Sequence, residues 1–272
     1  MAAGNFTVPW PEYPRPALRR AGNFTILNGR WDYAVSPTTV LEPPTTYQGS
    51  ILVPFPIEAP LSGVARSFSP RDVLWYRRWI GARPSSSQGS RRVLLNFEAV
   101  DYNATVWVNR IRVGSHDGGG SLPFSFDITD ALDAQGPNEL VVRVIDATDE
   151  GYQLHGKQLL EFRGRKIWYT PSSGIWQTVW MEEVEKVHVT RVHCTPTMDG
   201  AVSIRLGIAG NGASDTSLVA HIIAFLKGKP VARALPGLDP RRTGFSPSTV
   251  TCLAAILTLG SLLRLSPALP LC

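Results

Sequence analysis

Short apolar runs separated by turn-forming residues recur through the first two thirds of the chain. Residues 92–97, 104–108, 140–145 and 176–181 are rich in β-branched and aromatic side chains, as strands are. Gly- and Pro-containing segments such as 117–120 and 134–138 lie between them. No long stretch has the 3.6-residue period of an amphipathic helix. Many short strands joined by turns predict a β-sandwich or jelly roll.

The pattern continues more weakly in the last third. Residues 187–194, 201–208 and 218–226 are predicted as strands, and apolar side chains alternate along 201–208. Three strands at this spacing resemble the start of an immunoglobulin-like sandwich. After Asp239 the alternation fades, so we expect no strands there to complete it. The predicted fold class is therefore all-β: a jelly-roll β-sandwich followed by an incomplete immunoglobulin-like β-sandwich.

The amino-acid composition also changes near residue 186. All eight Trp and all seven Tyr lie before residue 181, and no acidic residue follows Asp239. We therefore predict a jelly-roll domain over residues 1–186 and a partial immunoglobulin-like domain over 187–238. Residues 239–272 are predicted to form an aberrant, poorly packed tail.

The net charge of +5 at first suggests a nucleic-acid partner. Residues 1–186, however, carry 19 basic and 19 acidic residues, so the whole net positive charge lies in residues 187–272, where the strand pattern is weakest. A nucleic-acid binder has its basic patch on the folded domain, so this class is disfavoured. The uncharged run 250–263 has 14 residues, short of the roughly 20 that cross a bilayer, which makes a membrane-tethered β-domain the least favoured reading.

The cysteines and the first residues of the chain indicate the cellular compartment. The three cysteines, Cys194, Cys252 and Cys272, form no disulfide framework. The first residues have neither the basic start nor the apolar stretch of a signal peptide. We therefore expect a cytoplasmic location.

The sequence contains none of the common nucleophile, zinc-protease, phosphate-loop or dinucleotide motifs. We therefore assign no catalytic residue, metal site or cofactor. Six carboxylates near predicted loops are expected to be solvated: Glu98, Asp101, Asp117, Asp149, Glu150 and Glu161. Four late aromatic residues either stack on sugars or pack in the core, and both readings stay open: Tyr152, Trp168, Tyr169 and Trp176.

Taken in order, local segments of residues 13–186 resemble the N-terminal part of glycoside hydrolase family 2, which includes β-galactosidases, β-glucuronidases and β-mannosidases. Each segment is weak alone, and their order makes the resemblance specific. They are YPRP at 13–16, LNGRW at 27–31, ILVPFP at 51–56, LSG at 61–63, WYRR at 75–78, DYNATVWVN at 101–109, VGSH at 113–116, PFSFDIT at 123–129, NEL at 138–140 and SGIWQTVWME at 173–182.

The resemblance implies a jelly-roll sugar-binding domain, an immunoglobulin-like domain and a (β/α)8 barrel that carries both catalytic glutamates and retains anomeric configuration. On this reading the chain is an N-terminal fragment of a carbohydrate-processing hydrolase, lacks the barrel, and is inactive alone. A terminal β-glycoside is its implied ligand, and a homo-oligomer is a compatible assembly of the parent. The alternative is a stand-alone carbohydrate-binding or interaction module without catalysis.

The resemblance also implies two substrate-binding residues. Residues 146–152 resemble a family loop that contacts the glycone, and Asp149 matches its sugar-contacting aspartate as a hydroxyl acceptor. Gln158, in a segment shared with one branch of the family, is the second candidate. A turn-capping role for Asp149 is an equal alternative.

The chain departs from the family pattern at two places. Asn109-Arg110 stands where the family has Asn-Gly, so we expect a longer turn or another turn type. The tail after about Pro236 matches nothing in the family, which suggests a shifted reading frame or a wrongly assigned intron.

Overall fold

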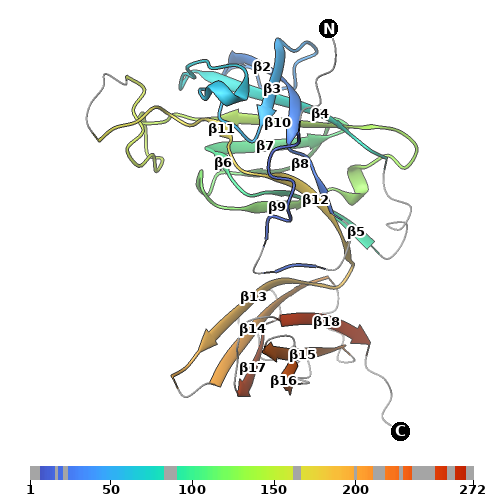
Figure 1. Ribbon diagram of the computed structural model, residues 1–272. Coiled ribbons are helices and arrows are strands. Elements are labelled where there is room, and N and C mark those ends of the chain that lie inside the picture. The colour runs from blue at the N-terminus through green and yellow to red at the C-terminus, as the bar shows by residue number, and fades with distance from the viewer. Residues whose placement is uncertain are drawn as a thin grey trace. The chain divides into compact units, whose positions relative to one another are not determined.

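The computed structural model describes residues 7–15, 18–20, 24–82, 91–161, 167–198, 201–210, 218–226, 229–234, 249–255 and 261–267. They divide into two compact units (Figure 1). The first comprises Met1–Pro14 and Ala21–Glu183, and the second comprises Arg15–Arg20 and Val184–Cys272.

The first unit is built on two β-sheets. The larger has six strands in antiparallel pairs, in the order β3 (Gly49–Val53), β2 (Gly29–Pro37), β4 (Asp72–Ile80), β10 (Asn138–Ile145), β7 (Asn103–Val108) and β8 (Ile111–His116). The smaller has four, in the order β1 (Phe24–Ile26), β12 (Val179–Glu185), β5 (Arg91–Phe97) and β9 (Phe124–Asp127). A two-stranded sheet pairs β6 (Val100–Asp101) with β11 (Gly174–Ile175), and the short 3-10 helices η1 (Pro60–Ser62) and η3 (Thr129–Ala131) lie in connections.

The core of this unit lies between the two large sheets. Tyr76 and Leu140 enter it from the six-stranded sheet, and Leu95 and Phe97 enter it from the four-stranded sheet. All four are fully buried. Leu95, Phe97 and Leu140 belong to the short apolar runs 92–97 and 140–145, from which strands were predicted. They face the core because every second side chain of a strand points the same way. The predicted all-β class with a jelly-roll sandwich is confirmed.

A smaller apolar cluster covers part of the outer face of the six-stranded sheet. It consists of Ala34, Val73, Trp75, Trp107 and Val141. The segment that joins β2 to β3 lies over it, since Val40 and Tyr47 pack against the cluster. The Gln48 side chain holds this segment to β2 by hydrogen bonds to both the N–H and the carbonyl of Val35 (3.1 and 2.9 Å).

The hairpin between β7 and β8 corrects one expectation. Val108 pairs directly with Ile111, so the turn has two residues, and both Asn109 and Arg110 have positive φ (49° and 65°). The turn is therefore the short left-handed kind that the family's Asn-Gly would form. Asn109 holds it in place, since its Nδ2 donates to the Ala131 carbonyl (2.9 Å) and its Oδ1 accepts from the Glu139 N–H (2.9 Å).

Replacing Arg110 by glycine should stabilise the first unit by about 1 kcal/mol, because glycine adopts positive φ without the steric cost that Arg bears. Urea unfolding followed by Trp fluorescence measures this unit, because every Trp of the chain lies within it. Arg112→Gly, two residues along in β8, is the control and should destabilise it. A loss of stability in Arg110→Gly would show that the positive φ of Arg110 does not destabilise the turn.

The second unit contains two three-stranded sheets. One consists of β13 (His188–Pro196), β14 (Ala201–Ala209) and β17 (Thr249–Ala255), and the other of β16 (Lys229–Ala234), β15 (Leu218–Leu226) and β18 (Ser261–Pro267). Val202, Ile204, Leu206 and Ile208 are buried along β14, as the alternation predicted.

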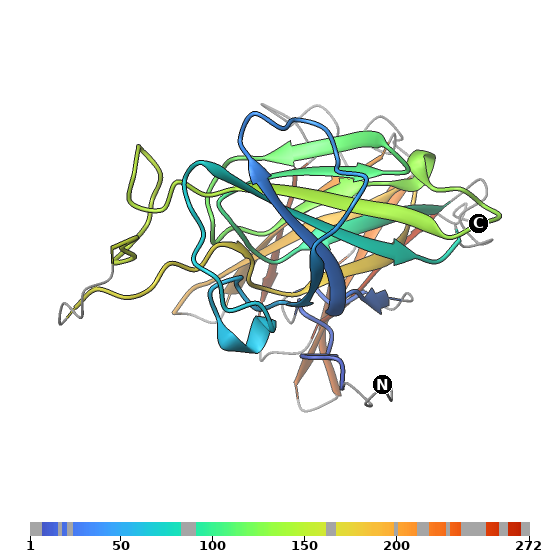
Figure 2. The ribbon, with the colours of Figure 1, turned by 90° about the horizontal axis from the view of Figure 1, so that it is seen from above.

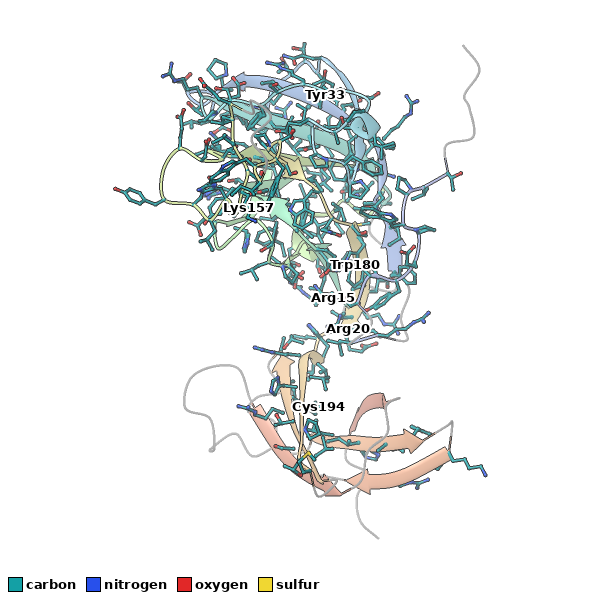
Figure 3. All side chains as sticks on the ribbon, turned by 60° about the vertical axis from the view of Figure 1, so that its left-hand side comes forward. Arg15, Arg20, Tyr33, Lys157, Trp180 and Cys194 are labelled. Carbon is teal, nitrogen blue, oxygen red and sulfur yellow. The ribbon has the colours of Figure 1, made fainter. Side chains whose placement is uncertain are left out.

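Two findings in this unit add to the sequence analysis. β17 pairs with β14 and β18 with β15, so strands exist beyond Asp239, where none was expected. Strand pairing in a sheet is non-local, and a weakly alternating sequence still supplies backbone donors and acceptors. The Arg20 side chain donates a 2.7 Å hydrogen bond to the Val189 carbonyl, which ties residues 18–20 to this unit (Figure 3). None of the helices in the described ranges has the length and apolar character needed to cross a membrane.

Candidate functional site

The two predicted substrate-binding residues lie on one long connection. It leaves the end of β10 and returns at β11, and we call residues 146–173 loop 146–173. Figures 1 and 2 show it, in yellow-green, projecting from the sandwich. Residues 162–166 lie outside the described residues. A long connection on a rigid sandwich is a frequent place for binding groups.

Asp146 anchors both ends of this loop. The residue is 1% exposed. Oδ1 accepts hydrogen bonds from the Thr148 N–H (2.7 Å) and the Gln153 side chain (2.6 Å), and Oδ2 accepts one from the Ser173 hydroxyl (2.6 Å). The Asp-x-Thr sequence folds locally because an Asp side chain readily accepts from the backbone N–H two residues later. Ser173 brings the returning end of the loop to the same carboxylate.

Gln158 makes a second anchor inside the loop. Its side chain is 8% exposed and both ends of its amide are occupied. Nε2 donates to Asp101 Oδ2 (3.1 Å), and Oε1 accepts from the Ser172 N–H (2.6 Å). The Gln158 side chain therefore faces the protein, and a direct contact with a sugar stays a prediction that requires one of these bonds to open.

Asp101 is buried, whereas the sequence predicted a solvated carboxylate. It is 7% exposed, and its Oδ1 is buried without a hydrogen-bond partner among the described residues. That oxygen faces Gly120, where a Cβ would lie closer to the oxygen than any real contact allows. Burial, with a smaller repulsion from Asp146, raises the pKa of Asp101 from 3.8 to about 6.

Glu58 is a third carboxylate at the base of the loop. Its Oε2 accepts a hydrogen bond from the Ser173 N–H (2.9 Å), and its Oε1 is buried without a partner in the described part of the chain. Burial raises the pKa of Glu58 to about 7, against the lowering effect of the Ser173 hydrogen bonds. Three acidic groups from distant segments thus meet where the loop joins the sandwich.

Asp149 lies farther out on the loop and is half-buried. Its Oδ1 accepts one long hydrogen bond, 3.4 Å, from the Leu160 N–H, so it does link two parts of the loop. Tyr152 nearby is fully exposed and Tyr169 is 49% exposed, so these two aromatic side chains do not pack in the core. The indole of Trp176 instead donates to the Gly120 carbonyl (2.7 Å).

The structure therefore separates the roles of the candidate residues. Asp149 and Gln158 share the loop without bonding to each other, and the groups that hold the loop are Asp146, Gln158 and Glu58. Neither Asp146 nor Glu58 was among the site residues predicted from the sequence. The Asp-Ala-Thr turn signal at 146–148 pointed to the first of them, whereas nothing local distinguishes Glu58.

The sequence comparison identifies the family. The model of "Glycosyl hydrolases family 2, sugar binding domain" matches residues 45–183, which include most of the first unit and the whole loop. The chain belongs to glycosyl hydrolase family 2. The first unit is the sugar-binding domain of this family, as the order of the local segments predicted.

Curated relatives of this family 2 chain are much longer than it is. A β-galactosidase of Thermoanaerobacter pseudethanolicus is 27% identical over 157 residues, which cover 56% of this chain and 20% of that protein. A putative β-glucuronidase of Formosa agariphila is 28% identical over 121 residues, 44% of this chain and 13% of that protein. The chain thus spans a fifth or less of the length of these two relatives.

Solved structures show the same fold. The β-glucuronidase of Bifidobacterium dentium, solved with coumarin-3-O-glucuronide, superposes with a TM-score of 0.65 at 20% identity, over 89% of this chain and 43% of that one. A β-glucuronidase of Ruminococcus gnavus gives a TM-score of 0.63 at 18% identity over 92% of this chain. The family 2 assignment therefore agrees with the three-dimensional fold.

Proposed function

We propose that this chain supplies the sugar-binding part of a retaining β-glycosidase, and that loop 146–173 contacts the terminal sugar of a β-glycoside. Hydrolysis with retention needs two carboxyl groups about 5–5.5 Å apart on either side of the glycosidic bond. We assign neither to the described residues, because the family resemblance implies a barrel domain as their source. The names of the relatives support a β-galactoside or β-glucuronide as substrate.

The observation that carries this proposal is the contrast between the ends of the loop and its outer part. Buried Asp146 and Gln158 hold the loop to the sandwich, while Asp149 keeps a half-buried carboxylate with one long hydrogen bond. A binding group that is supported by a rigid frame and still accessible is suited to accept a hydrogen bond from a sugar hydroxyl. We assign Gln158 the positioning of the loop and Asp149 the contact with the sugar.

The test uses a chimaera in which residues 24–183 replace the matching domain of the Thermoanaerobacter β-galactosidase. In an active chimaera, Asp149→Ala should lower kcat/KM about 10- to 100-fold, since a hydrogen bond to a charged group contributes about 1.5–3 kcal/mol. Glu150→Ala is the control, because Glu150 is the exposed neighbouring carboxylate. Unchanged kinetics in Asp149→Ala would remove the assignment.

A further inference from the structure

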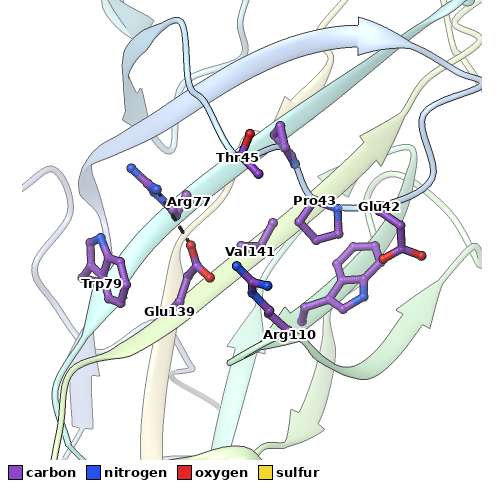
Figure 4. Close-up of a pocket in the computed structure, with 10 residues that line it drawn as sticks. Glu42, Pro43, Thr45, Arg77, Trp79, Arg110, Glu139 and Val141 are labelled. Atoms are coloured by element: carbon purple, nitrogen blue, oxygen red, sulfur yellow. Dashed lines mark ion pairs between the residues drawn. The ribbon is translucent and has the colours of Figure 1, made fainter.

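A groove lies on the outer face of the six-stranded sheet, and none of its lining residues belongs to loop 146–173. Its volume is about 450 Å³, within the range of about 300–1,000 Å³ typical of small-molecule sites. Figure 4 shows the residues that line it. Arg77 of β4, Val141 of β10 and Trp107 of β7 are paired across the sheet and form one row of its floor. Trp79 and Glu139 are the paired residues of the next row.

The groove exists because the cover over this face is incomplete. Val40 and Tyr47 of the segment between β2 and β3 pack on the outer apolar cluster, and residues 42–45 of the same segment form one wall of the groove. Trp79 lies beyond this cover and is 55% exposed. A large aromatic side chain presented on a sheet face beside polar groups is typical of a binding surface, because its apolar area is not otherwise used in packing.

The charged side chains in the groove are held in place and nearly balanced. Arg77 pairs with Asp32 (2.7 Å) and with Glu139 (3.8 Å), and its guanidinium lies over the Tyr47 ring at 4.1 Å. Arg110 and Glu42 add one charge of each sign to the lining. Arg77, the cation on the floor of the groove, is already paired with two carboxylates, so an anionic ligand would have to compete for it. The hydroxyls of an uncharged ligand can instead donate to the carboxylates and accept from the guanidinium groups.

We propose that this groove is a second carbohydrate site, separate from loop 146–173, and that it binds a neutral β-linked oligosaccharide. One sugar ring stacks with its C–H face on Trp79. Its hydroxyls donate to the Glu139 carboxylate and accept from the guanidinium groups of Arg77 and Arg110. Such a site would hold a polymeric substrate near the domain without taking part in its cleavage.

The experiment is calorimetric titration of the full chain with lactose, cellobiose and cellobiouronic acid, the last being the acidic counterpart of cellobiose. We expect the neutral disaccharides to bind with a Kd in the millimolar range or tighter, and the acidic one more weakly. Trp79→Ala should weaken binding at least tenfold, and Trp79→Phe should retain part of it. Glu139→Gln removes a negative charge and should shift the preference toward cellobiouronic acid, which a purely structural role would not do.

A control variant separates this site from loop 146–173. Glu150→Ala, which removes an exposed carboxylate of loop 146–173, should leave the titration unchanged. The titration does not depend on the activity of the chimaera. Absence of binding by both neutral sugars, tighter binding of the acidic one, or loss of binding in Asp149→Ala but not in Trp79→Ala would each overturn the groove assignment. So would sedimentation showing a wild-type dimer that Trp79→Ala converts to a monomer, because the occupant would then be a second copy of the chain.

Discussion

Asp146→Ala is expected to lower the free energy of unfolding of the first unit by about 3 kcal/mol. The substitution removes the common acceptor of the Thr148 N–H, the Gln153 amide and the Ser173 hydroxyl. Each buried donor left without a partner costs about 1 kcal/mol or more. Relief of the repulsion with Asp101 offsets a part of this loss. Urea unfolding followed by Trp fluorescence measures the change, and amide exchange at Thr148 and Ser173 should accelerate.

Two variants make that result specific. Glu150→Ala removes an exposed carboxylate from the same loop and should change stability by less than about 0.5 kcal/mol. Asp146→Asn keeps one oxygen acceptor and should be intermediate. If Asp146→Ala unfolds at the wild-type urea concentration with unchanged exchange at both amides, Asp146 does not anchor the loop.

The stability of the first unit should fall as pH rises from about 4 to about 7, and Asp101→Asn should remove much of this fall. Folding raises the pKa of Asp101 to about 6 and that of Glu58 to about 7, so in this interval the folded state binds protons that the unfolded state has released. Stability therefore decreases with pH wherever the folded state holds more protons. A shift of about two units for Asp101 corresponds to about 3 kcal/mol at pH 7.5.

An asparagine resembles the protonated form of Asp101 and can still accept from the Gln158 amide. Asp101→Asn should therefore match wild type near pH 4 and exceed its stability at pH 7.5, while Glu58 supplies the slope that remains. Unfolding curves at half-unit steps of pH measure this difference. Asp117→Asn, an exposed position, should leave the wild-type profile unchanged. A parallel profile for Asp101→Asn and wild type would show that Asp101 is ionised alike in both states.

The local sequence pattern was sufficient to predict several strands and to identify the family. The run 140–145 becomes strand β10 and 104–108 becomes β7, because short apolar runs of β-branched and aromatic side chains favour an extended conformation. The ordered short segments likewise identify the family, since each is a contiguous stretch whose turn or strand chemistry is local. The matched region, 45–183, lies inside the stretch over which that resemblance was stated.

The same local reasoning was wrong about the Asn109-Arg110 turn. The steric cost of positive φ at Arg110 predicted a different turn. In the structure the Asn109 side chain bonds to Ala131 and Glu139 and holds the short turn despite that cost. Those partners are distant in sequence, so their contribution is invisible in the residues of the turn alone.

Sequence by itself determined the all-β class, the strands β5, β7 and β10 and membership of a sugar-binding family, because these depend on local composition and contiguous motifs. Tertiary structure alone decided the state of Asp101, which lies 57 residues from its partner Gln158 and is buried where β6 pairs with β11. It alone also decided that the cover over the outer face stops short of Trp79. Strand pairing joins distant segments, and a side chain's burial and charge environment follow from those neighbours rather than from its own neighbours in the chain.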